Sequence, residues 1–170
     1  MTEAENGAWE EPMFFNSFTH SVDAQGRIAF PGEWRKIAGD CAFVMLPARN
    51  GALVLLPQRL FQEFLAGARK LAVANPKIQL AFAKIGSLAR PCRCDKQGRM
   101  ALDRTMLEKI QAESSVKLIG SLNHIRLTAP ENWQEPDIED LNLELDELQK
   151  AGESTGDAAA LLRSILGGGF

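Results

Sequence analysis

The pattern of apolar and polar positions changes its period along the chain, which predicts an alternation of strands and helices. Two short apolar runs, Ala42–Leu46 and Ala52–Leu56, flank the turn-rich segment Pro47–Gly51 and are typical of a β hairpin. The runs Val116–Gly120 and Ile125–Thr128 have the same arrangement in the second half of the chain. We therefore expect two β hairpins, one in each half.

Between these hairpins, apolar side chains recur at helical spacing. The spacing predicts one helix after Pro57, and Asn75 followed by Pro76 is typical of the start of a second, with a capping side chain and a proline in the first turn. The apolar positions are Leu60, Phe61, Phe64, Leu65, Ala68 and Leu71, then Ile78, Phe82, Ile85 and Leu88. We expect this helical hairpin to join two β units and its apolar stripes to pack in a core.

The two ends of the chain differ from this body in composition. The leader is acidic and polar, and we expect it to be disordered or loosely docked. Glu131–Trp133 is predicted to open another helix, the positions Ile138, Leu141, Leu145 and Leu148 are spaced as in an amphipathic helix, and residues 158–166 could form a short one. The predicted parts are a flexible leader (1–12), a first repeat with its helix (13–74), a linker helix with the second repeat (75–135), and an acidic, partly helical or disordered tail (136–170).

The chain contains an internal repeat. The segment Asp23–Phe30, Asp-Ala-Gln-Gly-Arg-Ile-Ala-Phe, recurs as Asp95–Leu102, Asp-Lys-Gln-Gly-Arg-Met-Ala-Leu, 72 residues further on. Each copy is followed by a short helix-like stretch, Pro31–Ala38 or Asp103–Ile110, and then by one of the two hairpins. A likeness over so many residues indicates duplication of a whole unit.

In each copy, the sequence Asp-x-Gln-Gly-Arg is typical of a tight turn. Glycine permits the positive φ that such a turn needs, and the aspartate can accept hydrogen bonds from backbone N–H groups two or three residues on. We therefore predict that Asp23, Gly26, Asp95 and Gly98 shape the two turns.

Each turn leads into an arginine at the start of a strand. A guanidinium has five donors that suit phosphate oxygens or the O6/N7 edge of guanine, and an ion pair with the motif aspartate would aim it. One such turn is more often only structural, but two in equivalent halves favour a pair of matching cationic contacts. Further basic residues surround the second turn (Arg90, Arg93, Lys96) and follow the first (Arg35, Lys36). The candidate DNA-contacting residues are Arg27, Arg99 and Lys96, then Gln25, Gln97, Arg93 and Arg35.

The net charge of −3 argues against nucleic-acid binding only as an average over the chain. Residues 13–130 carry a net charge of +9, whereas residues 131–170 carry −8. Affinity for DNA comes largely from Lys and Arg that neutralise phosphates, so a basic body between acidic ends is compatible with DNA binding. A basic surface of this kind is more often merely solvated, so the charge pattern alone does not establish DNA binding.

The sequence also bears on location and chemistry. No stretch approaches the ~20 apolar residues of a membrane span, and the first residues lack the pattern of a secretion signal. Cys41, Cys92 and Cys94 cannot all pair within one chain, which favours a reducing compartment, by default the cytoplasm. His20 and His124 have no partner at catalytic or metal-binding spacing, and Cys92 and Cys94 lack the Cys-x-x-Cys spacing of zinc sites. We expect no enzyme activity, no metal and no cofactor.

The two motif segments, Thr19–Pro31 and Cys94–Leu102, resemble the two signature segments of the MraZ family of bacterial transcription factors. The likeness covers about residues 13–135. It implies an α+β fold in which two pseudo-repeated, AbrB-like swapped-hairpin units close a small β-barrel and are linked by a helical hairpin, with peripheral helices. By the same likeness, the DNA-binding motif comprises Asp23, Arg27, Asp95 and Arg99.

The resemblance also implies partners. It predicts a ring-like homo-oligomer that sets the turns on a common rim, where they bind direct repeats in the promoter of the division and cell-wall operon that includes the protein's own gene. Such a regulator would be cytoplasmic and nucleoid-associated, with no membrane or small-molecule partner. Several weak contacts linked in one ring would also raise the affinity for DNA.

Some features depart from the family's pattern or lie outside it. Gln25 stands where lysine is common in the family, which removes a positive charge, and Asp103 replaces the proline found at Pro31 and is a good helix cap. The acidic leader and the tail have no counterpart in the resemblance. An alternative function is therefore an antitoxin-like, AbrB-like interaction module whose C-terminal tail docks on a protein partner. A further hypothesis is that the tail competes with DNA for the basic surface.

Overall fold

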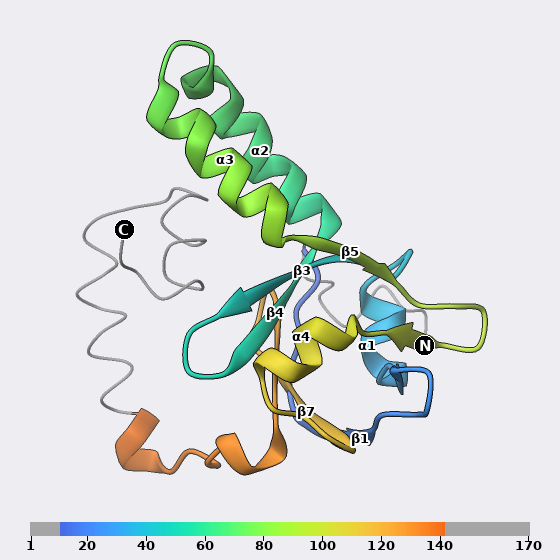
Figure 1. The fold of residues 1–170 in the computed structure, drawn as a ribbon. Helices are drawn as coiled ribbons and strands as arrows, with labels where there is room; N and C mark the ends of the chain where they lie inside the picture. The colour runs from blue at the N-terminus through green and yellow to red at the C-terminus, as the bar shows by residue number, and fades with distance from the viewer. Residues whose placement is uncertain (1–10, 142–170) are drawn as a thin grey trace, which may run out of the picture.

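The computed structural model describes residues 11–141 and has an α+β architecture (Figure 1). A six-stranded antiparallel sheet has the order β1-β7-β8-β4-β3-β5, and β2 and β6 form a separate two-stranded ribbon. The strands are β1 (Ser17–Ser21), β2 (Arg27–Ala29), β3 (Ala42–Ala48), β4 (Ala52–Pro57), β5 (Arg90–Arg93), β6 (Arg99–Ala101), β7 (Ser115–Gly120) and β8 (Ile125–Thr128). The helices are α1 (Gly32–Ile37), α2 (Gln58–Ala72), α3 (Pro76–Leu88) and α4 (Arg104–Lys109), with a 3-10 turn at Pro130–Asn132.

The hairpins and helices that the hydrophobic pattern predicts are confirmed. The pairs β3–β4 and β7–β8 are the two predicted hairpins, and α2 and α3 are the predicted helical hairpin. The Asn75 side chain caps α3 by accepting a hydrogen bond of 3.0 Å from the backbone N–H of Lys77. The Asp103 side chain caps α4 in the same way, through the N–H groups of Thr105 and Met106.

One predicted element is wrong. Glu131–Trp133 does not open an α-helix: the chain makes a single 3-10 turn and Trp133 is already extended, with φ −115° and ψ 125°. The chain turns helical only at Ile138, where the Leu141 N–H donates to the Asp137 carbonyl. The rest of the expected amphipathic helix, the short helix at 158–166 and most of the leader lie outside the described residues.

The strand pairings follow the sequence repeat with an approximate twofold symmetry. A displacement of 72 residues carries α1 onto α4 and β2 onto β6, and one extra residue before β7 makes the displacement from β3 to β7 73. Under this operation, the pair β1–β7 becomes β5–β3, whereas β2–β6 and β4–β8 map onto themselves. The first strand of each repeat therefore pairs with a strand of the other repeat, and both repeats contribute strands to the one sheet.

The sheet is open in the part of the chain that the structure describes. Its edge strands β1 and β5 each have one neighbour, and β2 and β6 form a separate ladder, to which only an isolated bridge between Met100 and Cys94 is added. These pairings show an α+β body made of a sheet and a separate ribbon, and they do not close the barrel that the resemblance implies.

The main core fills the space between the sheet and the ribbon, with α1 and α4. Trp34 is fully buried there, and its ring meets those of Phe14, Phe18 and Phe30 edge-on at centroid distances of 5.9, 5.0 and 6.0 Å. A smaller cluster covers the opposite face of β3 and β4, and consists of Val44, Leu46, Val54 and Leu56 packed against Leu60, Phe61, Phe64 and Ile85. Because both faces of β3 and β4 are covered, their sequences are continuous apolar runs.

The helical hairpin packs on the body only at its base. Its tip projects away from the sheet (Figure 1), and Leu71, Val73 and Leu80 are 64%, 80% and 57% exposed. No described side chain of α3 is buried. The expectation of core packing is therefore confirmed for the base of the hairpin and wrong for its tip, because the body is too small to reach that far along the helices.

Candidate nucleic-acid interface

Each copy of the repeated motif forms a closed turn around its aspartate. We call residues 23–27 turn 1 and residues 95–99 turn 2. In turn 1, one oxygen of Asp23 accepts hydrogen bonds of 2.9 Å from the backbone N–H groups of Gln25 and Arg27, and the other accepts 2.8 Å from Arg27 Nε. The corresponding bonds of Asp95 in turn 2 measure 2.9, 2.9 and 3.0 Å. The backbone donors lie two and four residues after the aspartate. The aspartate therefore accepts hydrogen bonds both from the backbone of the turn and from the side chain of the motif arginine.

The glycine of each turn is held by the other repeat. Gly26 and Gly98 both have a φ of +77°, in the left-handed region that favours glycine. The Gly98 carbonyl accepts a hydrogen bond of 2.9 Å from the Phe30 N–H, and the Gly26 carbonyl accepts one of 2.8 Å from the Leu102 N–H. The two turns therefore lie side by side on one side of the body (Figure 1).

The ribbon places the two motif arginines on one surface. Arg27 and Arg99 occupy diagonal positions of the β2–β6 ribbon, on either side of the buried pair Ile28 and Met100. Side chains alternate along a strand, so both arginines face outward, and diagonal partners are roughly 7–8 Å apart. Their side chains are 27% and 34% exposed.

Each aspartate engages only part of its arginine. The ion pair uses Nε, and a guanidinium has four further N–H donors on its two Nη atoms. Among the described residues, these Nη groups of Arg27 and Arg99 have no hydrogen-bond acceptor. The arrangement fixes the base of each guanidinium and leaves its outer edge able to bind two oxygens of an anion.

The turn bonds also keep the aspartates ionised. The backbone N–H of Arg27, more than any other contact, lowers the pKa of Asp23, and the backbone N–H of Arg99 does the same for Asp95. At neutral pH each pair is therefore a carboxylate bound to a guanidinium, with no net charge of its own. Any excess positive charge at the turns comes from neighbouring side chains.

Those neighbours differ between the two turns. Turn 2 has the exposed Lys96 where turn 1 has Ala24. Arg35, on α1, lies directly over turn 2: a Cβ built on Gly98 would be 1.8 Å from Arg35 Nη1. The residue at the position of Arg35 in the second repeat is Leu107, which is buried.

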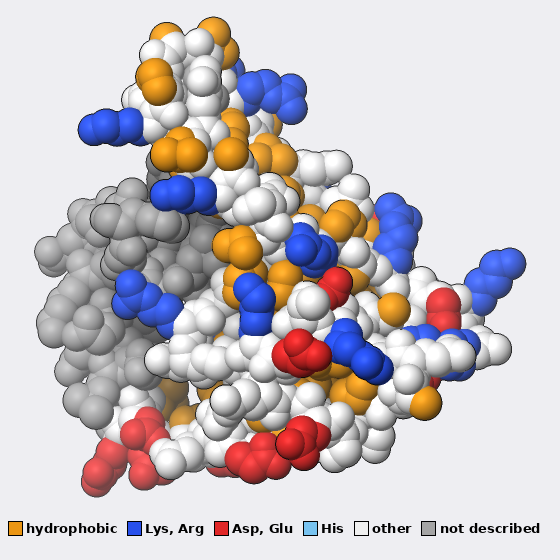
Figure 2. Space-filling view, in the orientation of Figure 1, with side chains coloured by type: hydrophobic (Ala, Val, Ile, Leu, Met, Phe, Trp, Pro, Cys, Tyr) orange, Lys and Arg blue, Asp and Glu red, His pale blue; other side chains and the backbone are white. Residues whose placement is uncertain are grey.

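Turn 1 has acidic neighbours instead. It borders a surface hollow that is also lined by Arg104, Glu108 and Glu113. The face shown in Figure 2 accordingly has no single basic patch, and basic and acidic side chains lie together where the turns project. Positive charge is therefore concentrated at turn 2.

The structure brings together some of the predicted contact residues and separates others. Lys96 and Arg35 join the motif arginines, although the sequence order places Arg35 after turn 1. Arg93 points elsewhere, because its Nη2 lies 3.5 Å from the Gln58 side chain at the start of α2. Arg90 donates to the backbone carbonyls of Ser87 and Ala89 at the end of α3. Gln25 and Gln97 have exposed side chains, and their backbone N–H groups serve the turns.

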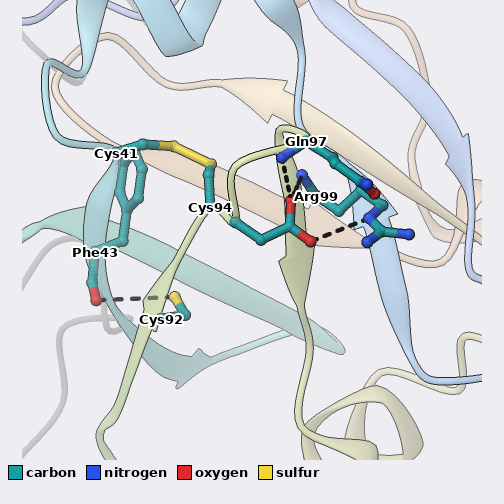
Figure 3. The surroundings of a disulfide bond; sticks show 7 residues. Cys41, Phe43, Cys92, Cys94, Gln97 and Arg99 are labelled. Atoms are coloured by element: carbon teal, nitrogen blue, oxygen red, sulfur yellow. Dashed lines mark hydrogen bonds and ion pairs between the residues drawn. A yellow bond between two sulfur atoms is a disulfide. The ribbon is translucent and has the colours of Figure 1, made fainter.

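A disulfide lies at the root of turn 2 (Figure 3). Cys41, just before β3, is bonded to Cys94, the residue before Asp95, with a Cα–Cα distance of 5.7 Å. The cysteine count does not predict this pairing, because the two residues are 53 positions apart and no spacing signals it. Cys92 is a free, half-buried thiol whose sulfur lies 3.8 Å from the Phe43 carbonyl, and burial raises its pKa to about 12.

The two histidines have structural surroundings. His20 lies in β1 with its ring stacked on Phe18, and His124 Nδ1 lies 2.9 Å from the Asn123 side chain. Burial lowers the pKa of His124 to about 4. Within residues 11–141, no three His, Cys, Asp or Glu side chains are grouped closely enough to hold a metal ion, and no helix could cross a bilayer.

Comparisons with known proteins find one family name. A family model described as "MraZ protein, putative antitoxin-like" matches residues 13–80. The chain is 25% identical over 127 residues to the transcriptional regulator MraZ of Lactiplantibacillus plantarum, an alignment that covers 75% of this chain and 89% of that protein. It is 25% identical over 142 residues to the MraZ of Lachnoclostridium phytofermentans (84% and 99% covered) and 27% identical over 126 residues to that of Corynebacterium urealyticum (72% and 85%).

The fold and its paired turns define a class of duplicated α+β proteins that present two matching arginine-bearing turns from one ribbon. These three relatives align with 72–84% of this chain and carry one name, transcriptional regulator MraZ. The chain is therefore similar to the MraZ family, whose model matches residues 13–80 and whose named members are 25–27% identical to it.

Proposed function

We propose that this chain is a sequence-specific, DNA-binding transcriptional regulator that contacts its promoter through turns 1 and 2. The observation that carries the proposal is the pair of partly exposed arginines on one face of the ribbon, each held at Nε by its own aspartate and each with Nη groups that have no hydrogen-bond acceptor among the described residues. The curated relatives are named transcriptional regulators, which supports the same class of function.

The turns suit a phosphate backbone. Holding a guanidinium before the ligand arrives reduces the conformational entropy that binding must remove, and bidentate contact to phosphate is a favoured geometry of arginine. Arg27 and Arg99 are the proposed primary contacts, and Lys96 and Arg35 add charge at turn 2. Gln25 and Gln97, which are exposed beside them, are the proposed base-reading residues.

We further propose that the two units are of the AbrB-like swapped-hairpin type. The exchange of first strands between the repeats, β1 onto β7 and β5 onto β3, supports this architecture. In this proposal, the parts of the chain have the boundaries predicted from the sequence, with the leader and the tail outside the duplicated body. The target would be direct repeats in the promoter of the division and cell-wall operon, read at the nucleoid in the cytoplasm.

Self-association completes the proposal. The exposed apolar tip of the helical hairpin supports a homo-oligomer, since burial against a second copy would remove Leu71, Val73 and Leu80 from water. Several copies would place several turn pairs on one DNA molecule and raise the effective concentration of each. A Leu80→Glu variant should then have a lower mass by light scattering than the unmodified protein.

The decisive experiment is a binding titration with the promoter fragment upstream of the protein's own gene, with scrambled DNA for comparison. Arg27→Ala, Arg99→Ala and the double variant are compared at 50 and 200 mM salt. Each lost phosphate contact should reduce the steepness of the salt dependence by ~0.9. Raising the salt fourfold weakens binding of the unmodified protein, and for each protomer that contacts DNA this loss should be about twelvefold smaller in the double variant.

Arg59→Ala is the matched control. Arg59 forms the same kind of pair, Nε to Glu63 at 3.1 Å and four residues apart, but on the exposed face of α2. It removes the same charge without touching a turn. The proposal fails if Arg59→Ala weakens binding as much as the motif variants, or if the double variant binds as tightly as the unmodified protein. Absence of any DNA binding would favour the antitoxin-like alternative, in which a protein partner takes the place of DNA.

A further inference from the structure

The disulfide between Cys41 and Cys94 joins two separate parts of the fold at turn 2. Cys94 directly precedes Asp95, whose carboxylate holds the turn and Arg99, while Cys41 lies between α1 and β3 (Figure 3). Since α1 also carries Arg35 over Gly98, the bond ties the turn to the element that lies on it.

The other repeat provides an internal comparison. The positions equivalent to Cys94 and Cys41 are Val22 and Ser114, at the displacements of 72 and 73 residues found above. The backbone contact is the same in both places: Val22 N–H donates to the Ser114 carbonyl at 2.8 Å, and Cys94 N–H donates to the Cys41 carbonyl at 3.3 Å. Only turn 2 has side chains that can be linked covalently at this point.

We propose that Cys41 and Cys94 are a reversible thiol–disulfide pair through which an oxidising low-molecular-weight disulfide fixes turn 2, but not turn 1, to the body of the protein. The consequence for DNA rests on the proposed function, whereas the thiol chemistry and its effect on the turn do not. Turn 2 is the turn with Lys96 and Arg35 beside its motif arginine, so the bond acts on the more cationic of the two.

The chemistry needs little rearrangement. The Cα–Cα distance of 5.7 Å is within the usual range for disulfides, so the reduced thiols can join without a large backbone movement. Cys94 is half-buried and Cys41 is only 6% exposed, so the external disulfide reacts at Cys94. The Cys94 thiolate displaces one thiolate from the oxidant, and the Cys41 thiolate then attacks the Cys94 sulfur and displaces the second. Two protein thiols lose two protons and two electrons, and the oxidant becomes two thiols.

The third cysteine does not compete. The Cys92 sulfur is directed to the Phe43 carbonyl and is half-buried, with a pKa raised to about 12 by burial, so its reactive thiolate form is scarce. This leaves Cys41 and Cys94 as the pair that exchanges, and it makes Cys92→Ser a matched control that removes a thiol near the same strand without removing the bond.

Fixing the turn should favour binding. A segment that is already ordered loses less conformational freedom when it meets its ligand, so the oxidised protein should hold Arg99 in place at a smaller entropic cost. Turn 1 should behave identically in the two states, because its root has no cysteine.

The first test uses no DNA. The full chain is equilibrated in buffers of reduced and oxidised glutathione, the disulfide is followed by intact mass after thiol alkylation, and amide hydrogen exchange is measured in both turns. We expect reversible loss of two hydrogens and exchange at Gln97 and Arg99 about tenfold slower in the oxidised protein, with Gln25 and Arg27 unchanged. Cys41→Ser and Cys94→Ser should abolish the difference, and Cys92→Ser should retain it. Failure of the pair to form with excess oxidised glutathione, or equal exchange in both states, overturns the proposal.

The second test measures binding of the promoter fragment by both states. Oxidation should tighten binding at least about threefold, an effect absent from Cys94→Ser. Equal affinity of the two states would overturn the regulatory role. If neither state binds DNA, the proposed function fails, while the exchange measurement still decides whether the cysteine pair fixes turn 2.

Discussion

Replacement of the turn glycines, Gly26 and Gly98, by alanine should affect stability equally at the two turns but DNA binding differently. Gly26 and Gly98 have the same φ of +77°, and alanine in this region costs about 1–2 kcal/mol relative to its preferred conformations. Alanine also restricts the unfolded chain, which offsets about 0.4–1 kcal/mol of that cost. Each variant should therefore lose about 1 kcal/mol of unfolding free energy, a Tm decrease of about 2–4 °C for a domain of this size.

What the new Cβ would contact differs between the two sites. At Gly26 the nearest atom is the Leu102 carbonyl oxygen at 3.2 Å, which needs to move by only a few tenths of an ångström. At Gly98 the Cβ would lie 1.8 Å from Arg35 Nη1. Because Arg35 is exposed and flexible, it can move aside with little loss of stability, but it then leaves turn 2.

The assay combines thermal unfolding with promoter titrations in a double-mutant cycle. Gly98→Ala should lower the salt slope of binding by about one contact, as Arg35→Ala does, and the two changes together should cost no more than either alone. Gly26→Ala should lower the Tm equally, and its effect on binding should add to that of Arg35→Ala. Additive effects of Gly98→Ala and Arg35→Ala would refute the argument that Arg35 contributes from its place on turn 2.

Three other predictions concern the turns and the core. Asp23→Asn and Asp95→Asn should each weaken promoter binding about two- to tenfold, because binding must then order an arginine side chain that the aspartate no longer holds. Removal of a negative charge alone would tighten binding, so tighter binding of both variants would show that the aspartate's hold on the arginine is unimportant. The turn bonds lower the pKa of both aspartates, so the stability that these bonds contribute should be complete at neutral pH. This stability should disappear only as the pH falls below about 3.9, the pKa of a free aspartate. Carboxyl NMR titration should find both pKa values below that of a free aspartate, and a higher value for either would contradict the bonding described. Trp34→Ala should cost about 3–5 kcal/mol in urea unfolding, since the ring is fully buried and its Nε1 donates to the Phe15 carbonyl at 2.9 Å; a loss below about 1 kcal/mol would mean that the core repacks.

The sequence by itself determined the local parts of this protein. The repeated Asp-x-Gln-Gly-Arg segment specifies its turn because the bonds of Asp23 reach no further than Arg27, and Asn75 and Asp103 cap their helices through the next turn of the chain. The hairpins follow from short apolar runs around turn residues. Such interactions connect neighbours, so the pattern of residues is sufficient to predict them.

The tertiary structure decided how these parts meet. Arg35 follows turn 1 in sequence but lies over turn 2, because the first strands of the repeats are exchanged and α1 packs beside the opposite turn. The same exchange brings Cys41 to Cys94, and the small size of the body leaves the tip of the helical hairpin exposed. Each of these depends on contacts between residues far apart in the chain, where no local spacing carries the information. The two turns are therefore alike in sequence and differ in their surroundings, and those surroundings distinguish one repeat from the other.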